Sequence, residues 1–241
     1  MLKLTIDNKA VEVAEGTTIL AAAALAGVAI PTLCHNEELT PAGACRICVV
    51  EVEKASSSAE LVTACSYPAV EGMVVRSASA KALEARKLAV ELLLALKPHS
   101  TALAKIADSL GVSEPRFELP QQECILCQLC TRSCQEVVGV NAITFIARGR
   151  ERENTDARVI WSNERCIACG SCAYICPTRA VTLEDNGGLR VLNTPSGRME
   201  FKLKACTKCG SYYAPEKQLE YMSRVSGIPL EKFDLCLDCR E

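Results

Sequence analysis

The 241-residue sequence is poor in aromatic residues: Phe, Trp and Tyr together make up 4%, with a single tryptophan. Neither charge is in large excess, because 27 Lys and Arg stand against 29 Asp and Glu for a net charge of −2. Proteins that bind nucleic acid usually present a basic surface and aromatic side chains that stack on bases. The composition therefore argues against nucleic-acid binding.

Long apolar stretches are also missing. The most apolar run, residues 19–30, is shorter than the ~20 residues that cross a bilayer, and it contains Gly27. The first residues alternate as in a strand and offer no charged-then-apolar secretory leader. We therefore expect a cytoplasmic protein with no membrane span, in a reducing compartment where disulfides are rare.

Cysteine is the one residue type in clear excess. The 16 cysteines fall into four groups of four and none is left over. In a reducing compartment, such groups are typical of metal ligands rather than disulfides. The groups are Cys34, Cys45, Cys48 and Cys65; Cys124, Cys127, Cys130 and Cys134; Cys166, Cys169, Cys172 and Cys176; and Cys206, Cys209, Cys236 and Cys239.

The pattern of residues 1–78 predicts a small β-grasp domain. Alternating apolar residues on either side of a turn at 7–9 indicate a β-hairpin. Thr17 or Thr18 is expected to cap an Ala-rich helix that runs to about Ala26. Further strands are predicted at 47–53 and 73–76.

The first cysteine group lies mostly in a long loop of this domain. Plant-type [2Fe–2S] proteins use C-x4-C-x2-C followed by a distant fourth cysteine. Here ten residues separate Cys34 from Cys45, so the plant-type spacing is not met. Zinc is the alternative occupant, but this gap is unusual for zinc fingers. Gly43 allows the close backbone approach that a loop around a cluster needs.

Three motifs in this region carry a family resemblance: P-T-L-C at 31–34, A-G-A-C-R-I-C-V-V-E-V at 42–52 and A-C-S-Y-P-A-V-E-G-M-V-V at 64–75. The segment resembles the N-terminal [2Fe–2S] domain of the large iron–sulfur subunit of respiratory complex I. Similar domains occur in diaphorase subunits of bidirectional hydrogenases, iron-only hydrogenases and NAD-linked formate dehydrogenases. The resemblance implies one [2Fe–2S] cluster held by Cys34, Cys45, Cys48 and Cys65.

Residues 79–120 are predicted to form a helical linker. Leucines at helical spacing predict an amphipathic helix over 82–96, whose polar side carries Lys81, Glu84, Arg86, Lys87 and Glu91. A shorter helix is predicted over 101–110. In the resembling family, a histidine and three cysteines here bind a further [4Fe–4S] cluster. His99 has no cysteine after it until Cys124, so we expect that cluster to be absent and His99 to be a surface or helix-end residue. His35, beside Cys34, is expected to lie near the cluster without ligating it.

Residues 121–202 contain two C-x2-C-x2-C-x3-C runs, an internal duplication typical of bacterial two-cluster ferredoxins. Each run is followed by a strand-like tail, at 142–145 and 180–183. In such ferredoxins the fourth cysteine of each run ligates the other cluster. The predicted sets are Cys124, Cys127, Cys130 and Cys176 for one [4Fe–4S] cluster, and Cys134, Cys166, Cys169 and Cys172 for the second.

Two features depart from the compact ferredoxin pattern. Gln135 stands where the first run would normally have proline, and 31 residues separate Cys134 from Cys166. The charged segment 149–156 within that gap is interpreted as a solvated surface loop, with a docking surface for a partner subunit as the alternative.

Residues 203–241 carry two C-x2-C knuckles, Cys206/Cys209 and Cys236/Cys239, with 26 residues between them and a helix predicted over 216–226. Paired knuckles suit a tetrahedral four-thiolate site in a zinc-ribbon or rubredoxin-like module. Zinc is the favoured occupant, while rubredoxin-type iron or a further iron–sulfur cluster remain open because thiolates alone do not choose between them.

The predicted fold class is α+β: a β-grasp [2Fe–2S] domain (1–78), a helical linker (79–120), a ferredoxin-like 2[4Fe–4S] domain (121–202) and a ribbon-like four-cysteine tail (203–241). The sequence has no G-x-G-x-x-G fingerprint after a strand and no P-loop. It also has no room for a hydrogen-activating or molybdopterin domain. We therefore expect a non-catalytic chain whose flavin, NAD(P) or hydrogen site lies on another chain.

The resemblance implies an iron–sulfur electron-transfer subunit of a cytoplasmic oxidoreductase complex of the diaphorase or electron-bifurcating class. Its expected partners are a subunit that handles flavin and NAD(P)H and a second redox site, which could be ferredoxin, hydrogenase or formate dehydrogenase. Two alternatives stay open. One is a free-standing polyferredoxin carrier, and the other is a zinc-based interaction module, which would be colourless.

Overall fold

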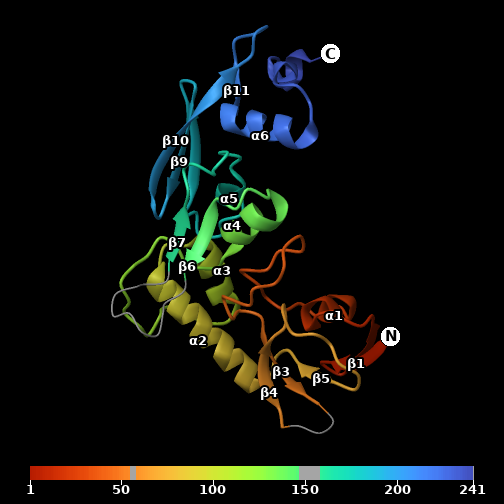
Figure 1. The fold of residues 1–241 in the computed structure, drawn as a ribbon. Helices are drawn as coiled ribbons and strands as arrows, with labels where there is room; N and C mark the ends of the chain where they lie inside the picture. Colours follow the sequence, from red (N-terminus) through yellow and green to blue (C-terminus); the bar gives the residue numbers. More distant parts are fainter. Residues whose placement is uncertain (55–57, 147–157, 241) are drawn as a thin grey trace. The chain divides into compact units, whose positions relative to one another are not determined.

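The computed structural model describes residues 1–54, 58–146 and 158–240. The chain divides into two compact units, Met1–Gln128 and Leu129–Glu241. Both mix helices and strands, so the predicted α+β class is confirmed (Figure 1). The charged segment predicted to form a surface loop at 149–156 lies outside the described residues.

The first unit is built on a five-stranded sheet with the order β2-β1-β5-β3-β4. Strands β1 and β5 pair in parallel, and the other neighbours pair antiparallel. The predicted hairpin is present: Asp7 and Asn8, with φ of 46° and 67°, form its two-residue turn. The strands are β1 (Leu2–Ile6), β2 (Lys9–Val13), β3 (Val49–Glu53), β4 (Glu60–Thr63) and β5 (Val74–Arg76).

Helix α1 (Ile19–Leu25) begins as the sequence predicts. The Thr18 hydroxyl accepts a hydrogen bond from the Ala21 backbone N–H at 3.2 Å and so caps the helix. One face of α1 packs on the sheet, and the core beneath it is almost wholly apolar. That core includes Leu4, Ile6, Val13, Ile19, Val50, Val52, Met73 and Val75.

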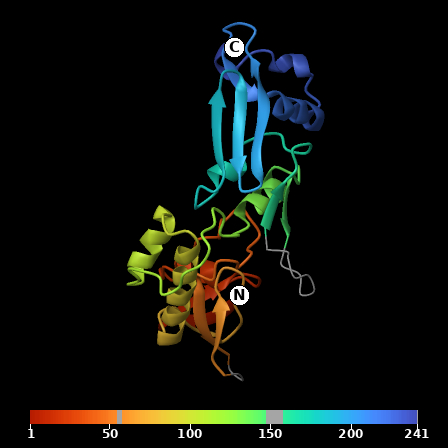
Figure 2. The same cartoon turned by 90° about the vertical axis from the view of Figure 1, so that its left-hand side faces the viewer.

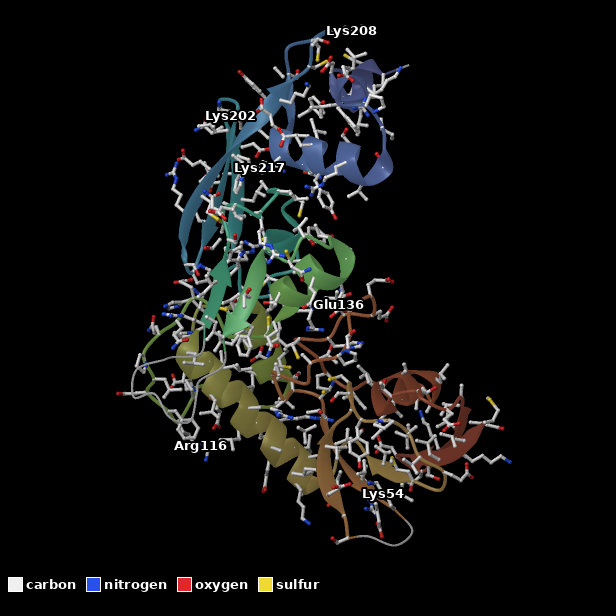
Figure 3. The ribbon with its side chains drawn as sticks, in the orientation of Figure 1. Lys54, Arg116, Glu136, Lys202, Lys208 and Lys217 are labelled. Carbon is white, nitrogen blue, oxygen red and sulfur yellow. The ribbon has the colours of Figure 1, made fainter. Side chains whose placement is uncertain are left out.

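Strand β3 is buried on both faces. Val50 and Val52 point into the α1 core, and alternation along the strand puts Val49 and Glu51 on the opposite face. Helix α2 (Ala80–Leu96) packs against β3, and α3 (Thr101–Ser109) packs against α2. The segment that follows α3 is held to α2 by an ion pair between Arg116, labelled in Figure 3, and Glu91, at 2.7 Å.

The predicted polar side of α2 is wrong for two residues. Arg86 and Glu91 are buried, with exposures of 4% and 7%, whereas Leu88 and Leu92 are 43% and 38% exposed. The physical reason is that α2 lies on the outer face of β3, which presents a backbone carbonyl and Glu51 rather than a purely apolar surface. Each buried charge therefore meets a polar group: Glu91 meets Arg116, and Arg86 meets the Val49 carbonyl.

The second unit starts with the cysteine-bearing loops. Helix α4 (Leu129–Arg132) continues into a π-helical turn, η1 (Ser133–Val137), and α5 (Ser171–Tyr174) contacts both. Strands β6 (Ile143–Ile146) and β7 (Arg158–Trp161) form an antiparallel pair.

A four-stranded antiparallel sheet with the order β11-β10-β9-β8 follows. Gly187 and Gly188, both with positive φ, form the tight turn between β8 and β9. Sequence analysis anticipated a strand near β8 but none of β9, β10 and β11. The strands are β8 (Thr182–Asn186), β9 (Leu189–Thr194), β10 (Gly197–Ala205) and β11 (Tyr212–Pro215).

Helix α6 (Glu216–Ser226) has the predicted bounds and packs on β10 and β11 (Figure 2). Leu219 is its buried anchor. Lys217, labelled in Figure 3, donates a hydrogen bond to the Asn163 carbonyl at 2.8 Å and lies over the Phe201 ring. The chain then passes through two short 3-10 turns, η2 (Leu230–Phe233) and η3 (Leu237–Cys239).

Among residues 1–54, 58–146 and 158–240, we find no helix with both the length and the apolar character needed to cross a membrane.

Met73→Ala tests the β-grasp core. Met73 is 1% exposed and packs against the β1 and β5 core residues, so its truncation should destabilise this unit by about 2–5 kcal/mol. Leu61→Ala is the matched control, because Leu61 on β4 is 45% exposed and should change the stability by about 0.5 kcal/mol or less. Hydrogen exchange of β1 and β5 peptides in increasing denaturant measures both. Equal effects of the two substitutions would contradict the described core.

Candidate metal centres

The structure brings the first cysteine group together. Cys34, Cys45, Cys48 and Cys65 are all buried. The Cys45 backbone N–H donates to Cys34 Sγ at 3.4 Å, and the Cys48 and Cys65 thiols hydrogen-bond to each other. The predicted ligands of the [2Fe–2S] cluster thus lie in one buried neighbourhood.

Strand pairing holds two of these cysteines side by side. Cys48 directly precedes β3 and Cys65 follows β4, and these strands pair with Val49 opposite Thr63. Beyond the strand ends, the pairing extends by one more hydrogen bond, from the Ala64 N–H to the Cys48 carbonyl at 3.1 Å. The β3–β4 hairpin therefore sets the distance between the Cys48 and Cys65 backbones.

Hydrogen bonding within this group also sets the acidity of its thiols. The Cys48 thiol donates to Cys65, which lowers the pKa of Cys65 to about 7 and raises that of Cys48. A thiol hydrogen bond to Cys34 likewise raises the pKa of Cys45. These protons leave when thiolates bind iron, so cluster assembly releases them.

Gly43 shapes the loop around the first group. Its φ of +60° lies in the left-handed region, and a Cβ there would sit 3.1 Å from Ser66 Oγ and 3.2 Å from Thr63 Oγ1. Its backbone N–H donates to Cys65. The glycine therefore lets the backbone come close enough to donate to a ligand sulfur.

A second group surrounds a cavity in the other unit. Cys134 lies there with Cys166, Cys169 and Cys172, although Cys134 belongs to the other motif in the sequence. These are the four residues that the crossed ferredoxin arrangement predicts as ligands of one cluster. The cavity is otherwise lined mainly by apolar groups, including Ile143, Ile167 and Leu192.

Several N–H groups point at the sulfurs of this cavity. The Ala142 and Ala168 backbone N–H groups donate to Cys134 and Cys166 Sγ at 3.3 and 3.4 Å. Burial raises the pKa of Cys172 to about 12, and the Trp161 indole N–H opposes that shift. Trp161 Nε1 is buried, and although it faces Cys172 it makes no hydrogen bond of normal geometry within the described residues. A buried donor beside four thiols fits an anionic, sulfide-rich cluster, which would supply its acceptor.

Polar contacts from outside the cysteine motif fix this loop. Arg190 on β9 donates to the Ala168 carbonyl at 3.0 Å while its other nitrogens hold Asp185 at 2.7 Å. Ala168 has a left-handed φ of 54°. The Ser133 and Ser171 hydroxyls, beside Cys134 and Cys172, hydrogen-bond at 2.6 Å. These residues position the ligand loops, and sequence analysis did not single them out.

The remaining ferredoxin cysteines are divided between the two units. Cys124 and Cys127 lie in the first, and Cys130 and Cys176 lie in the second. Backbone N–H groups again face the sulfurs: Leu126 donates to Cys124 at 3.4 Å, and Ala180 donates to Cys176 at 3.2 Å. Their assembly around one cluster stays a prediction.

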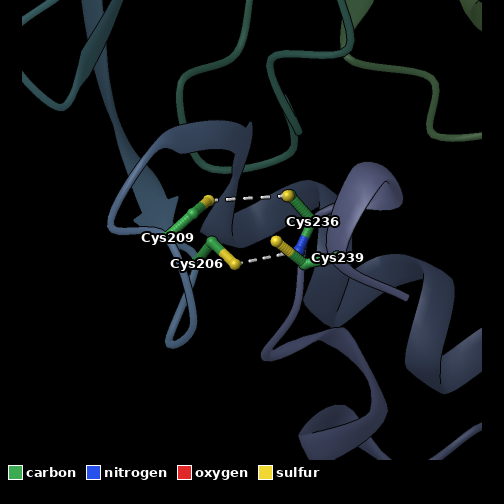
Figure 4. Close-up of side chains that lie close together, drawn as sticks. All are labelled: Cys206, Cys209, Cys236 and Cys239. Carbon is green, nitrogen blue, oxygen red and sulfur yellow. Dashed lines mark hydrogen bonds between the residues drawn. The ribbon is translucent and has the colours of Figure 1, made fainter. Parts of the chain in front are cut away.

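The C-terminal cysteines form the tightest group (Figure 4). The sulfurs of Cys206, Cys209, Cys236 and Cys239 all lie within 4.8 Å of one another. Cys209 Sγ and Cys236 Sγ are 3.8 Å apart, and the Cys236 backbone N–H donates to Cys206 Sγ at 3.4 Å. The N–H groups of Cys236 and Cys209 lower the pKa of Cys206 to about 6.

This spacing is compared with the geometry of a single tetrahedral ion. A tetrahedral zinc with Zn–S bonds of about 2.3 Å has sulfur–sulfur edges of about 3.8 Å, because the edge is ~1.6 times the bond length. The Cys209–Cys236 distance of 3.8 Å matches that edge. The C-terminal donor set therefore fits one tetrahedral metal ion.

The histidines lie outside these four groups. His99, after α2, is exposed, as expected for a surface residue. His35 follows Cys34, and its Nδ1 is buried without a hydrogen-bond partner in the part of the chain that the structure describes.

Comparisons with known proteins identify both iron–sulfur domains. Residues 1–80 match the family described as "2Fe-2S iron-sulfur cluster binding domain", and residues 123–180 match the "4Fe-4S dicluster domain". The chain is 35% identical over 204 residues to the NADPH-Fe(3+) oxidoreductase subunit alpha of Geobacter sulfurreducens, covering 74% of this chain and 24% of that protein. It is 33% identical over 208 residues to an NADH-quinone oxidoreductase subunit of Rhizobium meliloti, covering 75% and 24%.

Two further relatives extend the likeness to hydrogenases. The NADP-reducing hydrogenase subunit HndD of Solidesulfovibrio fructosivorans is 31% identical over 212 residues, covering 75% of this chain and 36% of that protein. A chain of the crystal structure of NAD+-reducing [NiFe]-hydrogenase in the H2-reduced state superposes with a TM-score of 0.57 at 27% identity, covering 67% and 75%.

These matches confirm the predicted resemblance. The chain carries a [2Fe–2S] domain of the kind found in NADH-quinone oxidoreductases and hydrogenases, joined to a ferredoxin-type [4Fe–4S] domain. It is a chain with two iron–sulfur cluster-binding domains. It spans about a quarter (24%) of the length of the first curated relatives it matches.

Gly43→Ala tests the close backbone approach at the first group. The added Cβ forces a left-handed alanine, at about 1–2 kcal/mol, and also crowds Ser66 and Thr63. Gly16→Ala is the matched control, because Gly16 has a φ of +84° but nothing within 4 Å of the added Cβ. We expect both variants to be less stable and only Gly43→Ala to lose [2Fe–2S] occupancy, measured by visible circular dichroism. Equal occupancy in the two variants would contradict the assigned contact.

Proposed function

We propose that this chain is an electron-transfer subunit of a cytoplasmic, multi-subunit oxidoreductase. It relays single electrons between a subunit that handles flavin and NAD(P)H and a second redox site, such as ferredoxin, a hydrogenase or a formate dehydrogenase. The observation that carries the proposal is the complete division of 16 cysteines into four ligand sets, each with backbone N–H groups directed at its sulfurs.

The first centre is one [2Fe–2S] cluster with Cys34, Cys45, Cys48 and Cys65 as ligands. The match of residues 1–80 to a [2Fe–2S] domain and the common burial of these four thiols support the assignment. A binuclear cluster accepts one electron at a time, which suits a relay between two-electron flavin chemistry and one-electron carriers.

Two [4Fe–4S] clusters are proposed in the ferredoxin domain, with crossed ligands. Cys134, Cys166, Cys169 and Cys172 hold one, and their shared cavity supports that set. Cys124, Cys127, Cys130 and Cys176 hold the other, on the strength of the repeated motif. Crossing requires the two cubanes to be neighbours, which favours electron transfer between them.

The C-terminal site is proposed to hold one zinc ion through Cys206, Cys209, Cys236 and Cys239. The four sulfurs all lie within 4.8 Å of one another, which supports a mononuclear centre over a fourth cluster, whose ligand sulfurs would be spread over two or more irons. Zinc has no redox chemistry, so its role here is to staple η3 to the β10–β11 turn. Rubredoxin-type iron would fit the same geometry and is the alternative outcome of metal analysis.

The printed names of the relatives support the choice of reaction class. They belong to an NADPH-Fe(3+) oxidoreductase, an NADH-quinone oxidoreductase and an NADP-reducing hydrogenase. Because this chain corresponds to only a part of each, the donor, the acceptor and any electron bifurcation belong to the proposal. We propose that the flavin and NAD(P) sites lie on another chain, because these 241 residues contain neither a G-x-G-x-x-G fingerprint after a strand nor a P-loop.

Native co-purification tests the proposal directly. The tagged chain, isolated anaerobically from its own cells, should bring down stoichiometric flavoprotein, and the complex should reduce the clusters with NADH or NADPH. A red-brown chain that purifies alone and accepts electrons only from ferredoxins would overturn the subunit role and favour a free polyferredoxin. A colourless chain containing only zinc would overturn both.

Trp161 provides a reporter for the second [4Fe–4S] cluster because it is the only tryptophan and lines that cavity. We expect its fluorescence to be strongly quenched in the cluster-loaded protein and to recover in Cys169→Ala, which removes a ligand of that cluster. Cys34→Ala, which removes a [2Fe–2S] ligand, is the control and should leave the quenching unchanged. Unquenched fluorescence in iron-replete wild-type protein would refute the assigned cavity.

Metal analysis tests the C-terminal site. Cys209→Ser should reduce zinc by about one equivalent without changing the iron or acid-labile sulfide content. Hydrogen exchange should rise in η3 and the β10–β11 turn, because the metal joins these two segments through its four thiolates. A fall in sulfide would instead identify an iron–sulfur cluster at this site.

A further inference from the structure

Arg86 on α2 is a buried cation without an ion pair. Its exposure is 4%, and within the described residues no carboxylate lies at ion-pair distance from it. Two other arginines of this unit are paired, Arg76 with Glu53 and Arg116 with Glu91, both through exposed guanidinium groups. An unpaired charge in a protein interior is strongly unfavourable, so a buried guanidinium needs an anion nearby.

The guanidinium is anchored to the backbone next to Cys48. Arg86 Nε donates to the Val49 carbonyl at 2.7 Å, and Val49 follows Cys48 directly in the chain. Nη2 is also buried but has no hydrogen-bond partner in the described part of the structure. The guanidinium thus uses one N–H to fix its position and keeps a second donor unsatisfied.

The charged groups nearest to Arg86 are few. Burial lowers the pKa of Arg86, whereas Cys48 and, less strongly, Asp7 raise it. Asp7 is already engaged by Ser77, whose backbone N–H donates to its carboxylate at 2.7 Å. Glu51, on the same strand as Val49, faces Lys81 at 3.6 Å. Cys48, a proposed cluster ligand, is therefore the group best placed to supply the missing negative charge.

A [2Fe–2S] cluster provides that charge. Two ferric ions, two sulfides and four thiolates form a doubly negative anion, and uptake of one electron makes it triply negative as one ferric ion becomes ferrous. A fixed positive charge at one ligand stabilises the reduced form more than the oxidised form. A positive charge that is buried in a medium of low polarity stabilises the reduced cluster more than a solvated surface charge does.

We propose that Arg86 is the counter-cation of the [2Fe–2S] cluster and that it raises the cluster's reduction potential from the Cys48 side. The inference rests on the proposed ligand set of Cys34, Cys45, Cys48 and Cys65. Arg86 is a positioning and tuning residue, since it acts on the cluster through its ligand loop. Because Arg86 lies on α2 and binds the Val49 carbonyl on β3, the reduction potential of the cluster also depends on how α2 packs on β3.

Redox titration of the full-length, anaerobically prepared chain tests this. With dithionite as reductant, the [2Fe–2S] signal is followed by electron paramagnetic resonance in wild type, Arg86→Met and Arg86→Gln. We expect both variants to disfavour reduction at least tenfold, a fall in potential of about 59 mV or more for a one-electron couple. The [4Fe–4S] potentials of the same samples serve as internal references and should not move.

Two further variants separate charge from structure. Arg86→Lys keeps the charge and should retain most of the wild-type potential. Arg76→Met removes an exposed arginine from β5 of the same sheet and should shift the potential much less, because solvent and Glu53 screen that charge. If Arg86→Met does not hold the cluster, Arg86→Gln carries the test, since an amide N–H can still donate to the Val49 carbonyl.

The outcomes distinguish this inference from the proposed ligand set. A wild-type chain with no [2Fe–2S] signal would refute the ligand set itself. A normal signal whose potential is the same in wild type, Arg86→Met and Arg86→Gln would overturn the role of Arg86 alone. A fall in Arg86→Lys as large as that in Arg86→Met would also overturn it, because the charge is retained there.

Discussion

Hydrogen bonds from backbone N–H groups to cysteine sulfurs are the interaction on which the rest of this structure depends. Each proposed ligand set has at least one: Cys45 to Cys34, Leu126 to Cys124, Ala142 to Cys134 and Cys236 to Cys206, all at 3.3–3.4 Å. Such donors stabilise negative charge on sulfur, which a metal-bound thiolate retains. To aim them, the loops adopt left-handed conformations at residues such as Gly43, Arg46, Leu126, Gln128 and Ala168.

The surrounding elements keep these loops in place, and they do so with side chains from outside the cysteine motifs. The pairing of β3 with β4 sets the distance between the Cys48 and Cys65 backbones. Arg190 on β9 donates a hydrogen bond to the Ala168 carbonyl, and Arg86 on α2 donates one to the Val49 carbonyl. Both arginines therefore contact a ligand loop at one of the loop's backbone carbonyls. At these two loops the side chains bind backbone carbonyls and so do not compete for the thiolates.

Local patterns were enough to predict much of the architecture. Helix α6, α1 with its Thr18 cap and the hairpin at Asp7–Asn8 follow from periodicity, capping and turn residues. Cys134 lines one cavity with Cys166, Cys169 and Cys172, and this is the set that the resemblance to two-cluster ferredoxins implies for one cluster. In β10 the alternation of Met199, Phe201 and Leu203 indicates a strand, and the sequence analysis, which concentrated on the cysteine motifs, did not use it.

What local patterns could not reveal depends on tertiary packing. Helical periodicity placed Arg86 and Glu91 on a solvent face, but α2 lies on a strand face that offers a carbonyl and charged groups. Nothing near Trp161 in sequence connects it to Cys172, since β7 is brought there only by pairing with β6. The division of the ferredoxin cysteines between the two units likewise has no signature in the motif.

The most direct test of the central claim is the state of the iron that these thiolates bind. Mössbauer spectroscopy of the chain loaded with 57Fe should show binuclear and cubane iron in a ratio of about one to four, as expected for one [2Fe–2S] and two [4Fe–4S] clusters. All of the iron should be bound with acid-labile sulfide. Isolated ferrous ions in thiolate sites, or cubane iron no more than twice the binuclear iron, would contradict the account.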